Sequence, residues 1–224
     1  MWDSFLHLLR AQLDNQLFVG GFVLGLVGLA AAWLRKVPGM LWSYFNRVII
    51  VTAVIDTGID TTHDDLKNVL WRNAREIPGN GVDDDQNGYT DDVNGYNFAL
   101  NRPSPHYVSS VKSYQHGTHV SGLAAAQGEN ALGGAGVMPF ETRIMMLNVF
   151  GRSDGASSAD IANAIRYAAD NGADVINLSL GGEDDGDPDN PVRAACRLAS
   201  VEYGLDVIAA AGNSGPKMTT VMLP

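Results

Sequence analysis

Beyond residue 47, the chain alternates between short apolar runs suited to buried β-strands and longer segments with helical spacing. The expected strands share apolar and β-branched residues and are Val48–Ile55, Ile144–Val149, Val175–Leu180 and Val207–Ala211. The expected helices share small apolar residues at helical intervals and are His116–Gln127, Ser157–Asn171 and Pro191–Tyr203. Strands that are apolar on both sides need cover on both faces of their sheet. The sequence therefore predicts an α/β domain, in which a mostly parallel sheet lies between two layers of helices.

The composition narrows the functions open to such a domain. Hydrophobic residues make up 46% of the chain and charged residues 18%, which is typical of a globular protein and not of a disordered one. The formal net charge of −10 argues against nucleic acid as a partner, because phosphate binding needs a basic surface. Cys196 is the single cysteine, so the chain forms no internal disulfide. Its place in a helical segment indicates a buried structural residue and not a nucleophile.

The first 47 residues differ in character from the rest of the chain. Leu17–Leu34 holds 18 residues without a charge and is followed by two basic residues, which is long enough for a transmembrane-type helix. We therefore expect residues 1–47 to be a membrane anchor with its juxtamembrane stretch. A cleaved signal peptide is the alternative, with Ala30 and Ala32 as the small residues of its cleavage site.

Residues suited to acid–base chemistry stand at the ends of the expected strands. Asp56 follows the first strand, Asn213 follows the last, and His116 opens the first helix. Functional groups of a parallel sheet collect just beyond the carboxyl ends of its strands, so these side chains are expected at one edge. An imidazole can take the proton of a serine hydroxyl, a buried carboxylate orients that imidazole, and an amide N–H stabilises the oxyanion that forms. The set is typical of nucleophilic hydrolysis.

Four motifs resemble those of the subtilisin-like serine proteases, the subtilases of peptidase family S8, in the same order and with similar spacing. They read VTAVIDTGID, HGTHVSG, VINLSLGG and AAAGNSG and occupy Val51–Asp60, His116–Gly122, Val175–Gly182 and Ala209–Gly215. By position, the resemblance implies that Asp56 is the triad aspartate, His116 the triad base and Asn213 the oxyanion donor. The implied fold is the subtilisin-like three-layer α/β/α domain, and the implied activity is that of a serine endopeptidase.

The resemblance also implies how a substrate binds. Ser179, Leu180 and Gly181 match the backbone edge on which a protein or peptide substrate adds as an extended strand. The expected partner of the domain is therefore a polypeptide.

The serine nucleophile of the family is not recognisable in the sequence. It stands in a Gly-Thr-Ser-Met-Ala turn well after the oxyanion asparagine, whereas nine residues follow Gly215 here. Ser121 and Ser214 lack that context. We therefore expect residues 48–224 to be the amino-terminal portion of a catalytic domain, incomplete at its carboxyl end and inactive alone. The alternatives are a peptide-binding pseudoprotease and an artefactual fusion of a membrane anchor with a protease fragment.

Two observations disagree about the compartment of the domain. The resemblance to the family implies an extracytoplasmic or secreted protease. Arg35 and Lys36, on the carboxyl side of the apolar span, favour the cytoplasmic side of a membrane instead. We expect the extracytoplasmic orientation, and the cytoplasmic one is the alternative.

An acidic stretch between the expected aspartate and histidine of the triad has the spacing of a calcium-binding loop. Its oxygen-bearing residues fall on alternate positions and are Asp83, Asp85, Asn87, Tyr89 and Asp91. Gly88 permits the sharp turn, whereas Asn94 stands where an EF-hand has glutamate. Subtilases with similar insertions bind calcium, so we expect a structural Ca²⁺ here, with a solvated acidic turn as the alternative. The resemblance adds Asp65 and Asn130 as ligands of a second calcium site.

Overall fold

The computed structural model describes residues 49–138, 142–151, 155–182, 187 and 189–213. The apolar segment Leu17–Leu34 lies outside these residues, so the predicted anchor is not part of the described structure. Within the described ranges there is no helix that is long and apolar enough to cross a membrane.

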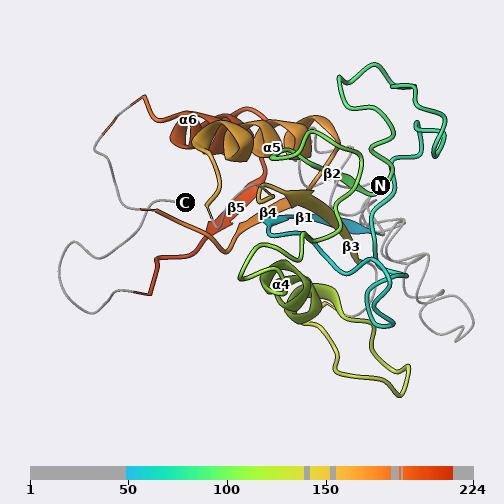
Figure 1. Ribbon diagram of the computed structural model, residues 1–224. Coiled ribbons are helices and arrows are strands. Elements are labelled where there is room, and N and C mark those ends of the chain that lie inside the picture. The colour runs from blue at the N-terminus through green and yellow to red at the C-terminus, as the bar shows by residue number, and fades with distance from the viewer. Residues whose placement is uncertain (1–48, 139–141, 152–154, 183–186, 188, 214–224) are drawn as a thin grey trace, which may run out of the picture. The chain divides into compact units, whose positions relative to one another are not determined.

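The domain is built on a sheet of five strands (Figure 1). In chain order these are β1 (Ile50–Asp56), β2 (Gly95–Asn97), β3 (Thr142–Asn148), β4 (Val175–Leu178) and β5 (Asp206–Ala209). Across the sheet they are arranged as β2-β3-β1-β4-β5, and every neighbouring pair is parallel. Four of the strands confirm the sequence prediction. The fifth, β2, is absent from that prediction because its three residues show no apolar periodicity.

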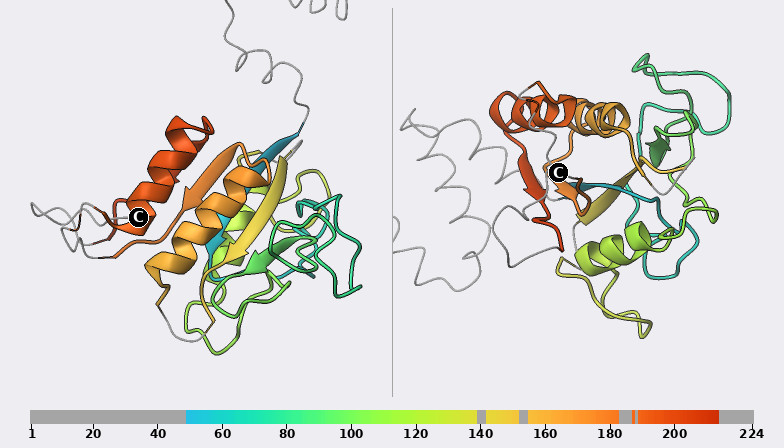
Figure 2. Two further views of the ribbon diagram at one scale, coloured as in Figure 1. Left: turned by 90° about the horizontal axis from the view of Figure 1, so that it is seen from above. Right: turned by 60° about the vertical axis from the view of Figure 1, so that its left-hand side comes forward.

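Helices cover both faces of this sheet. They are α4 (His116–Ala125), α5 (Ser158–Asp170) and α6 (Pro191–Val201). Figures 1 and 2 show α5 and α6 side by side on one face and α4 on the other. Both α5 and α6 begin at a side-chain cap, because Ser157 Oγ accepts a hydrogen bond from Asp160 N and Asn190 Oδ1 accepts one from Val192 N. The predicted three-layer α/β/α architecture is therefore confirmed.

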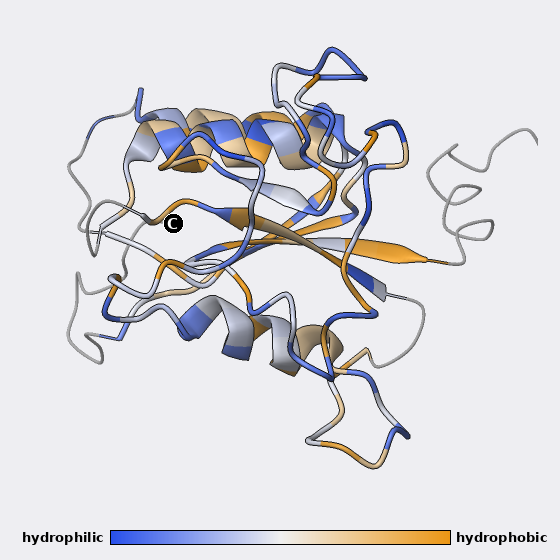
Figure 3. Ribbon diagram, turned by 45° about the vertical axis from the view of Figure 1, so that its right-hand side comes forward, coloured by the Kyte–Doolittle hydropathy of each residue, from blue (hydrophilic) through white to orange (hydrophobic). Residues whose placement is uncertain are grey.

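Two apolar clusters hold the layers together. The larger lies between the sheet and helices α5 and α6, and Ile55 and Ile165 are fully buried in it. The smaller lies between the sheet and α4 and contains Val54 and Met146. Successive residues of β1 alternate between the two clusters, as the pleat of a strand requires. Figure 3 shows apolar residues along the strands in the middle of the domain.

The topology places the end of β1 in the middle of the carboxyl edge of the sheet. β1 pairs with β3 on one side and β4 on the other, and Asp56 lies opposite Asn148 at the end of β3. A side chain at this position is surrounded by the loops that follow neighbouring strands. The edge is therefore where chemistry is expected in an open parallel sheet.

Candidate active site

Asp56 and His116 form a direct pair at this edge. Nδ1 of His116 lies 2.8 Å from Oδ1 and 2.9 Å from Oδ2 of Asp56. Asp56 is completely buried, and its Oδ1 also accepts a hydrogen bond of 2.7 Å from Thr57 N. A buried carboxylate that holds Nδ1 leaves Nε2 as the free ring nitrogen of a neutral imidazole. The side chain of His116 is 44% exposed, so the ring is accessible to a reacting group.

The start of α4 is attached to the turn after β1 by residues of the two motifs. Thr57 Oγ1 accepts a hydrogen bond of 3.0 Å from Gly117 N and donates one of 3.2 Å to Tyr114 O. Gly117 is needed at this contact, because an added Cβ would lie 2.3 Å from the Gly58 carbonyl oxygen. Gly58 itself has a φ of +98°, which disfavours any side chain. The Asp-Thr-Gly and His-Gly motifs thus bring the helix against the strand end and orient the pair.

The other predicted site residues follow neighbouring strands. Ser179 comes directly after β4, and its hydroxyl accepts a hydrogen bond of 2.9 Å from Asn177 Nδ2. Leu180 packs against the larger apolar cluster, while Gly181 is exposed. Asn213 is exposed in the bend that follows β5. Because the strands are parallel, the segments after β1, β4 and β5 all leave the sheet at the same edge.

Neither Ser121 nor Cys196 has the environment of a nucleophile. Ser121 lies on α4 and is completely buried, so it is inaccessible to a substrate. Cys196 lies on α6, and burial raises the pKa of its thiol. A thiol with a raised pKa stays protonated at neutral pH and reacts slowly.

Comparisons with known proteins identify the family of the chain. The model of the subtilase family matches residues 49–224. The chain belongs to the subtilase family. It is 39% identical over 168 residues to the thermophilic serine proteinase of Bacillus sp. (strain AK1), a match that covers 75% of the chain and 34% of that protein. It is 37% identical over 182 residues to the major intracellular serine protease of Bacillus subtilis (strain 168), covering 80% of the chain and 48% of that protein.

Solved structures show the same fold. Fervidolysin from Fervidobacterium pennivorans, a keratinolytic enzyme related to subtilisin, superposes with a TM-score of 0.55 at 28% identity, over 80% of this chain and 24% of that one.

The matched part of the chain covers about a third to a half of the length of the two Bacillus relatives.

The predicted calcium loop brings some of its carboxylates together and separates another from them. Asp83 and Asp85 both accept a hydrogen bond from Asn87 N, at 3.0 and 3.2 Å. Asp91 instead accepts hydrogen bonds from the backbone N–H groups of residues 80 and 81, at 3.1 and 2.9 Å. Among the described His, Cys, Asp and Glu side chains, the group within reach of one ion is Glu76, Asp83 and Asp85. Sequence spacing does not reveal Glu76, because it lies outside the loop motif.

Asp92 is a second buried acid of this region that the motif does not single out. Its carboxylate is fully buried and accepts three hydrogen bonds, from Asn73 Nδ2 at 2.9 Å, Asn87 Nδ2 at 2.8 Å and Tyr167 OH at 2.5 Å. Since Tyr167 belongs to α5, Asp92 connects the acidic loop to the helical layer. Burial, together with the neighbouring Asp92 carboxylate, raises the pKa of Tyr167.

Asp65 and Asn130, the residues of the second predicted calcium site, lie in contact. Nδ2 of Asn130 donates a hydrogen bond of 2.7 Å to Oδ1 of Asp65, whose side chain is buried. Gly133 lies against the same carboxylate, so that a Cβ at this position would lie 2.0 Å from Asp65 Oδ2. The structure thus brings both predicted residues together, with the amide nitrogen and not the amide oxygen facing the carboxylate.

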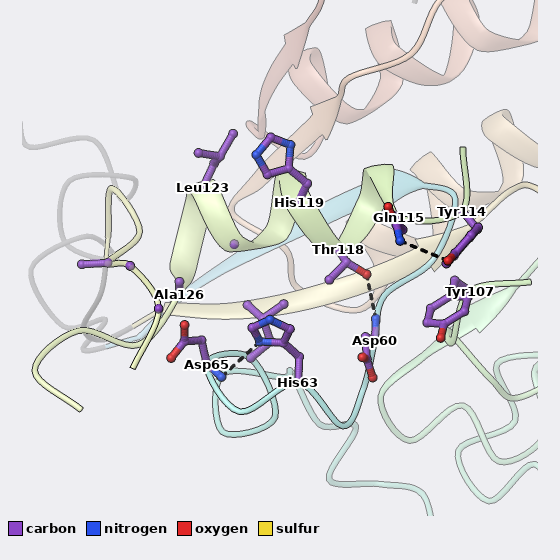
Figure 4. A pocket seen from close by; sticks show the side chains of 15 residues that line it. Asp60, His63, Asp65, Tyr107, Tyr114, Gln115, Thr118, His119, Leu123 and Ala126 are labelled. Carbon is purple, nitrogen blue, oxygen red and sulfur yellow. Dashed lines mark hydrogen bonds between the residues drawn. The ribbon is translucent and has the colours of Figure 1, made fainter. Parts of the chain in front are cut away.

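A pocket of about 680 Å³ lies between α4 and the segments around residues 60–66 and 133–135 (Figure 4). Thr118 Oγ1 accepts a hydrogen bond of 2.9 Å from Asp60 N at its wall, and Tyr107 and Tyr114 line another side. Neither Asp56 nor His116 lines this pocket, although Gln115 and Thr118 do. The pocket is therefore separate from the Asp56–His116 contact.

Proposed function

We propose that the protein is a serine endopeptidase in which His116 is the general base and Asp56 orients it. The observation that carries this proposal is the Nδ1 contact of 2.8 Å to a completely buried carboxylate beside a partly exposed imidazole. Such a carboxylate selects the tautomer with Nε2 free and stabilises the imidazolium that forms on proton transfer. In a serine protease triad, such an aspartate and histidine activate the serine nucleophile.

The remaining steps are assigned to the segments beside the pair. His116 Nε2 takes the proton of a serine hydroxyl as that oxygen attacks the substrate carbonyl, and later gives the proton to the leaving amine. The Asn213 amide donates a hydrogen bond to the oxyanion. The substrate lies extended along residues 179–181. We propose that the serine comes from outside the described residues, since the buried Ser121 cannot fill the role.

The test compares His116→Ala with His119→Ala, which removes an exposed histidine one turn further along the same helix. The variants are made in the chain with its native continuation or, where the gene encodes none, with the carboxyl-terminal part of the Bacillus subtilis relative. His116→Ala is expected to abolish both fluorophosphonate labelling and hydrolysis of denatured casein, and His119→Ala to retain both. Equal labelling of the two variants would contradict the assignment. Peptide binding without hydrolysis in the unmodified protein would favour the pseudoprotease alternative.

A second test needs only the 224 residues. A hydrogen-bonded Nδ1–H between imidazole and carboxylate gives a proton NMR signal far downfield of other histidine signals. Asp56→Asn is expected to remove or strongly shift that signal, while His119→Ala leaves it in place. A signal that responds to the second substitution and not the first would show that the pair is misassigned.

We further propose that the domain binds structural calcium. The support is the acidic composition of residues 73–92 and the group of Glu76, Asp83 and Asp85, which offer oxygens within reach of one ion. Carboxylate and amide oxygens are the ligands that Ca²⁺ prefers. Calcium is expected to raise the melting temperature of the chain, and removal by EGTA to reverse the rise. A melting temperature that changes neither with calcium nor with EGTA would exclude the proposal.

We also propose that Leu17–Leu34 anchors the protein in a membrane with the protease domain on the extracytoplasmic side. The length of the uncharged segment supports the anchor, and the resemblance to the family supports the extracytoplasmic orientation. The full chain is expected to resist alkaline extraction from membranes, and a variant without residues 1–47 to be released. Digestion of the domain by protease added to intact cells would support the orientation, and protection from it would favour the cytoplasmic alternative.

A further inference from the structure

Helix α4 begins without a capping side chain of its own. Gln115, at its N-cap position, makes no side-chain hydrogen bond to the first turn, and that turn holds no acidic residue. The free N–H groups at such a helix end need partners from elsewhere. Gly117 N finds one in Thr57 Oγ1, on the turn that follows β1. The position of this helix end therefore depends on tertiary contacts.

The side chains that α4 buries against the sheet are small. The fully buried ones are Gly117, Ser121 and Ala125. Val120 is partly buried against the smaller apolar cluster, and Leu123 is 59% exposed. The Ser121 hydroxyl has no hydrogen-bond partner in the described part of the chain. Small side chains make fewer contacts with a facing sheet than large ones, so we expect polar contacts at the first turn to decide how α4 is rotated about its axis.

Thr118 makes a polar contact of this kind. Its Oγ1 accepts a hydrogen bond of 2.9 Å from Asp60 N (Figure 4). Asp60 follows Ile59, which is completely buried. The backbone of Ile59 is held on both sides, because its N–H donates to Pro105 O at 3.0 Å and its carbonyl accepts from Tyr107 N at 3.3 Å. The hydrogen bond of Thr118 thus joins α4 to a well-anchored segment.

Thr118 and His116 lie on either side of the residue that faces the sheet. Successive residues of an α-helix are about 100° apart around its axis, so the two side chains flank the buried Gly117. His116 contacts the Asp56 carboxylate, and Thr118 contacts the backbone of Asp60. A rotation of α4 that moves Thr118 away from Asp60 N also shifts the imidazole relative to the carboxylate. The two contacts are therefore coupled through the helix.

We propose that Thr118 is a positioning residue for the base. Its hydrogen bond to Asp60 N keeps α4 rotated so that Nδ1 of His116 stays within hydrogen-bond distance of the Asp56 carboxylate. The proposal rests on the function proposed above, in which His116 is the base. An imidazole that leaves this position loses the carboxylate that orients it, and a displacement of about 1 Å can lower a rate about 100-fold.

The test measures how fast the Nδ1 proton of His116 exchanges with water in the 224-residue chain, by proton NMR. Thr118→Val keeps the shape of the side chain and removes the acceptor, and is expected to speed the exchange about tenfold or more. Thr118→Ser restores the acceptor and is expected to stay within about twofold of the wild type.

The matched control is Thr142→Val. It removes a hydroxyl that donates a hydrogen bond of 3.1 Å to Ile50 O, at the end of β1 remote from Asp56. The control is expected to lower the melting temperature and to leave the exchange rate of the His116 proton unchanged. A loss of stability alone is thereby distinguished from a loss of position.

Activity gives a second measurement in a form of the protein that includes the nucleophile. Thr118→Val is expected to lower kcat about 10- to 100-fold with KM nearly unchanged, because the base acts in the transition state and does not hold the substrate. Thr118→Ser is expected to recover most of the loss.

The outcomes separate this proposal from the function on which it rests. A wild-type Nδ1 proton signal that is absent, or that persists in Asp56→Asn, overturns both. A signal that Asp56→Asn removes but that exchanges at the wild-type rate in Thr118→Val overturns only the role of Thr118. Equal acceleration in Thr118→Val and Thr142→Val has the same consequence. Should Thr118→Val fail to fold, Thr118→Ala takes its place with the same expected rates.

Discussion

The two faces of the sheet are used differently. On the α5 and α6 face, the described apolar side chains form a large cluster in which Ile165, Ile176 and Leu178 are fully buried. The α4 face has a smaller cluster, whereas exposed large apolar side chains occur in both layers: Leu123 on α4 is 59% exposed, Ile208 on β5 57% and Val201 on α6 74%. Ile208 belongs to the α4 face because its neighbour Val207 packs into the opposite cluster.

The two faces also differ in the side chains that their helices bury. α4 buries small residues, Gly117, Ser121 and Ala125, and a helix with short side chains can approach a strand end closely. That close approach places His116 on Asp56. Helix α5 buries Ile161, Ile165 and Tyr167 in addition to four alanines, and so removes more apolar surface from water. Asp56 and His116 therefore meet on the face with the smaller described cluster.

The largest expected effect tests the chemical face. Asp56→Asn, in a form of the protein that includes the nucleophile, is expected to lower kcat by about four orders of magnitude, because an amide favours the wrong imidazole tautomer. The free energy of unfolding should change far less than kcat. Rates with a chromogenic peptide and urea unfolding of the same sample measure the two. A loss of kcat below tenfold would refute the role of Asp56.

The next effect compares the two faces directly. Ile165→Ala removes a fully buried side chain of α5 and is expected to lower the free energy of unfolding by about 2–5 kcal/mol. Leu123→Ala removes an exposed side chain of α4 and is expected to change it by about 0.5 kcal/mol or less. Urea unfolding followed by circular dichroism measures both. Equal losses would mean that the α4 face stabilises the domain as much as the other.

A smaller effect concerns the link between the acidic loop and α5. Tyr167→Phe removes the hydrogen bond to Asp92 and leaves that buried acceptor short of a donor, at a cost of about 1–3 kcal/mol. Burial raises the pKa of Tyr167 in the folded state, so the stability that the protonated phenol contributes is present below the unfolded pKa of about 10 and is lost as the pH rises above it. The wild type should therefore lose more stability than Tyr167→Phe between pH 9 and about 11. Parallel melting curves for the two proteins would disprove the link.

The smallest effect is the reactivity of Cys196. Because burial raises the pKa of its thiol, iodoacetamide at pH 8 should alkylate the folded chain roughly tenfold more slowly than the chain in urea. Mass spectrometry over time gives both rates. Equal rates would show that Cys196 is exposed to solvent and would contradict the packing of α6.

Much of the fold and of the active pair could be predicted from the sequence. The strands β1, β3, β4 and β5 each contain an apolar run that can be recognised in the sequence, whereas the three residues of β2 form a strand by pairing with β3. Asp56 and His116 stand in motifs whose glycines and threonine the structure uses to join strand and helix. Glu76 could not be found because it lies outside the loop motif, and Asp92 could not be found because it falls between the alternate positions that the motif marks.

The sequence by itself determined the family and the parallel α/β architecture, and it predicted Asp56 and His116 as the pair at the sheet edge. These follow from local periodicity and from short motifs in which neighbouring residues act together. Only the tertiary structure decided that Asp56 and His116, 60 residues apart in the chain, are in contact, and which carboxylates of residues 76–92 come together. Asp91 has the right spacing yet binds a different turn, and Glu76 has no motif yet lies beside Asp83 and Asp85. Which side chains can bind one ion depends on the distances between their oxygens, and the fold of the loop sets those distances.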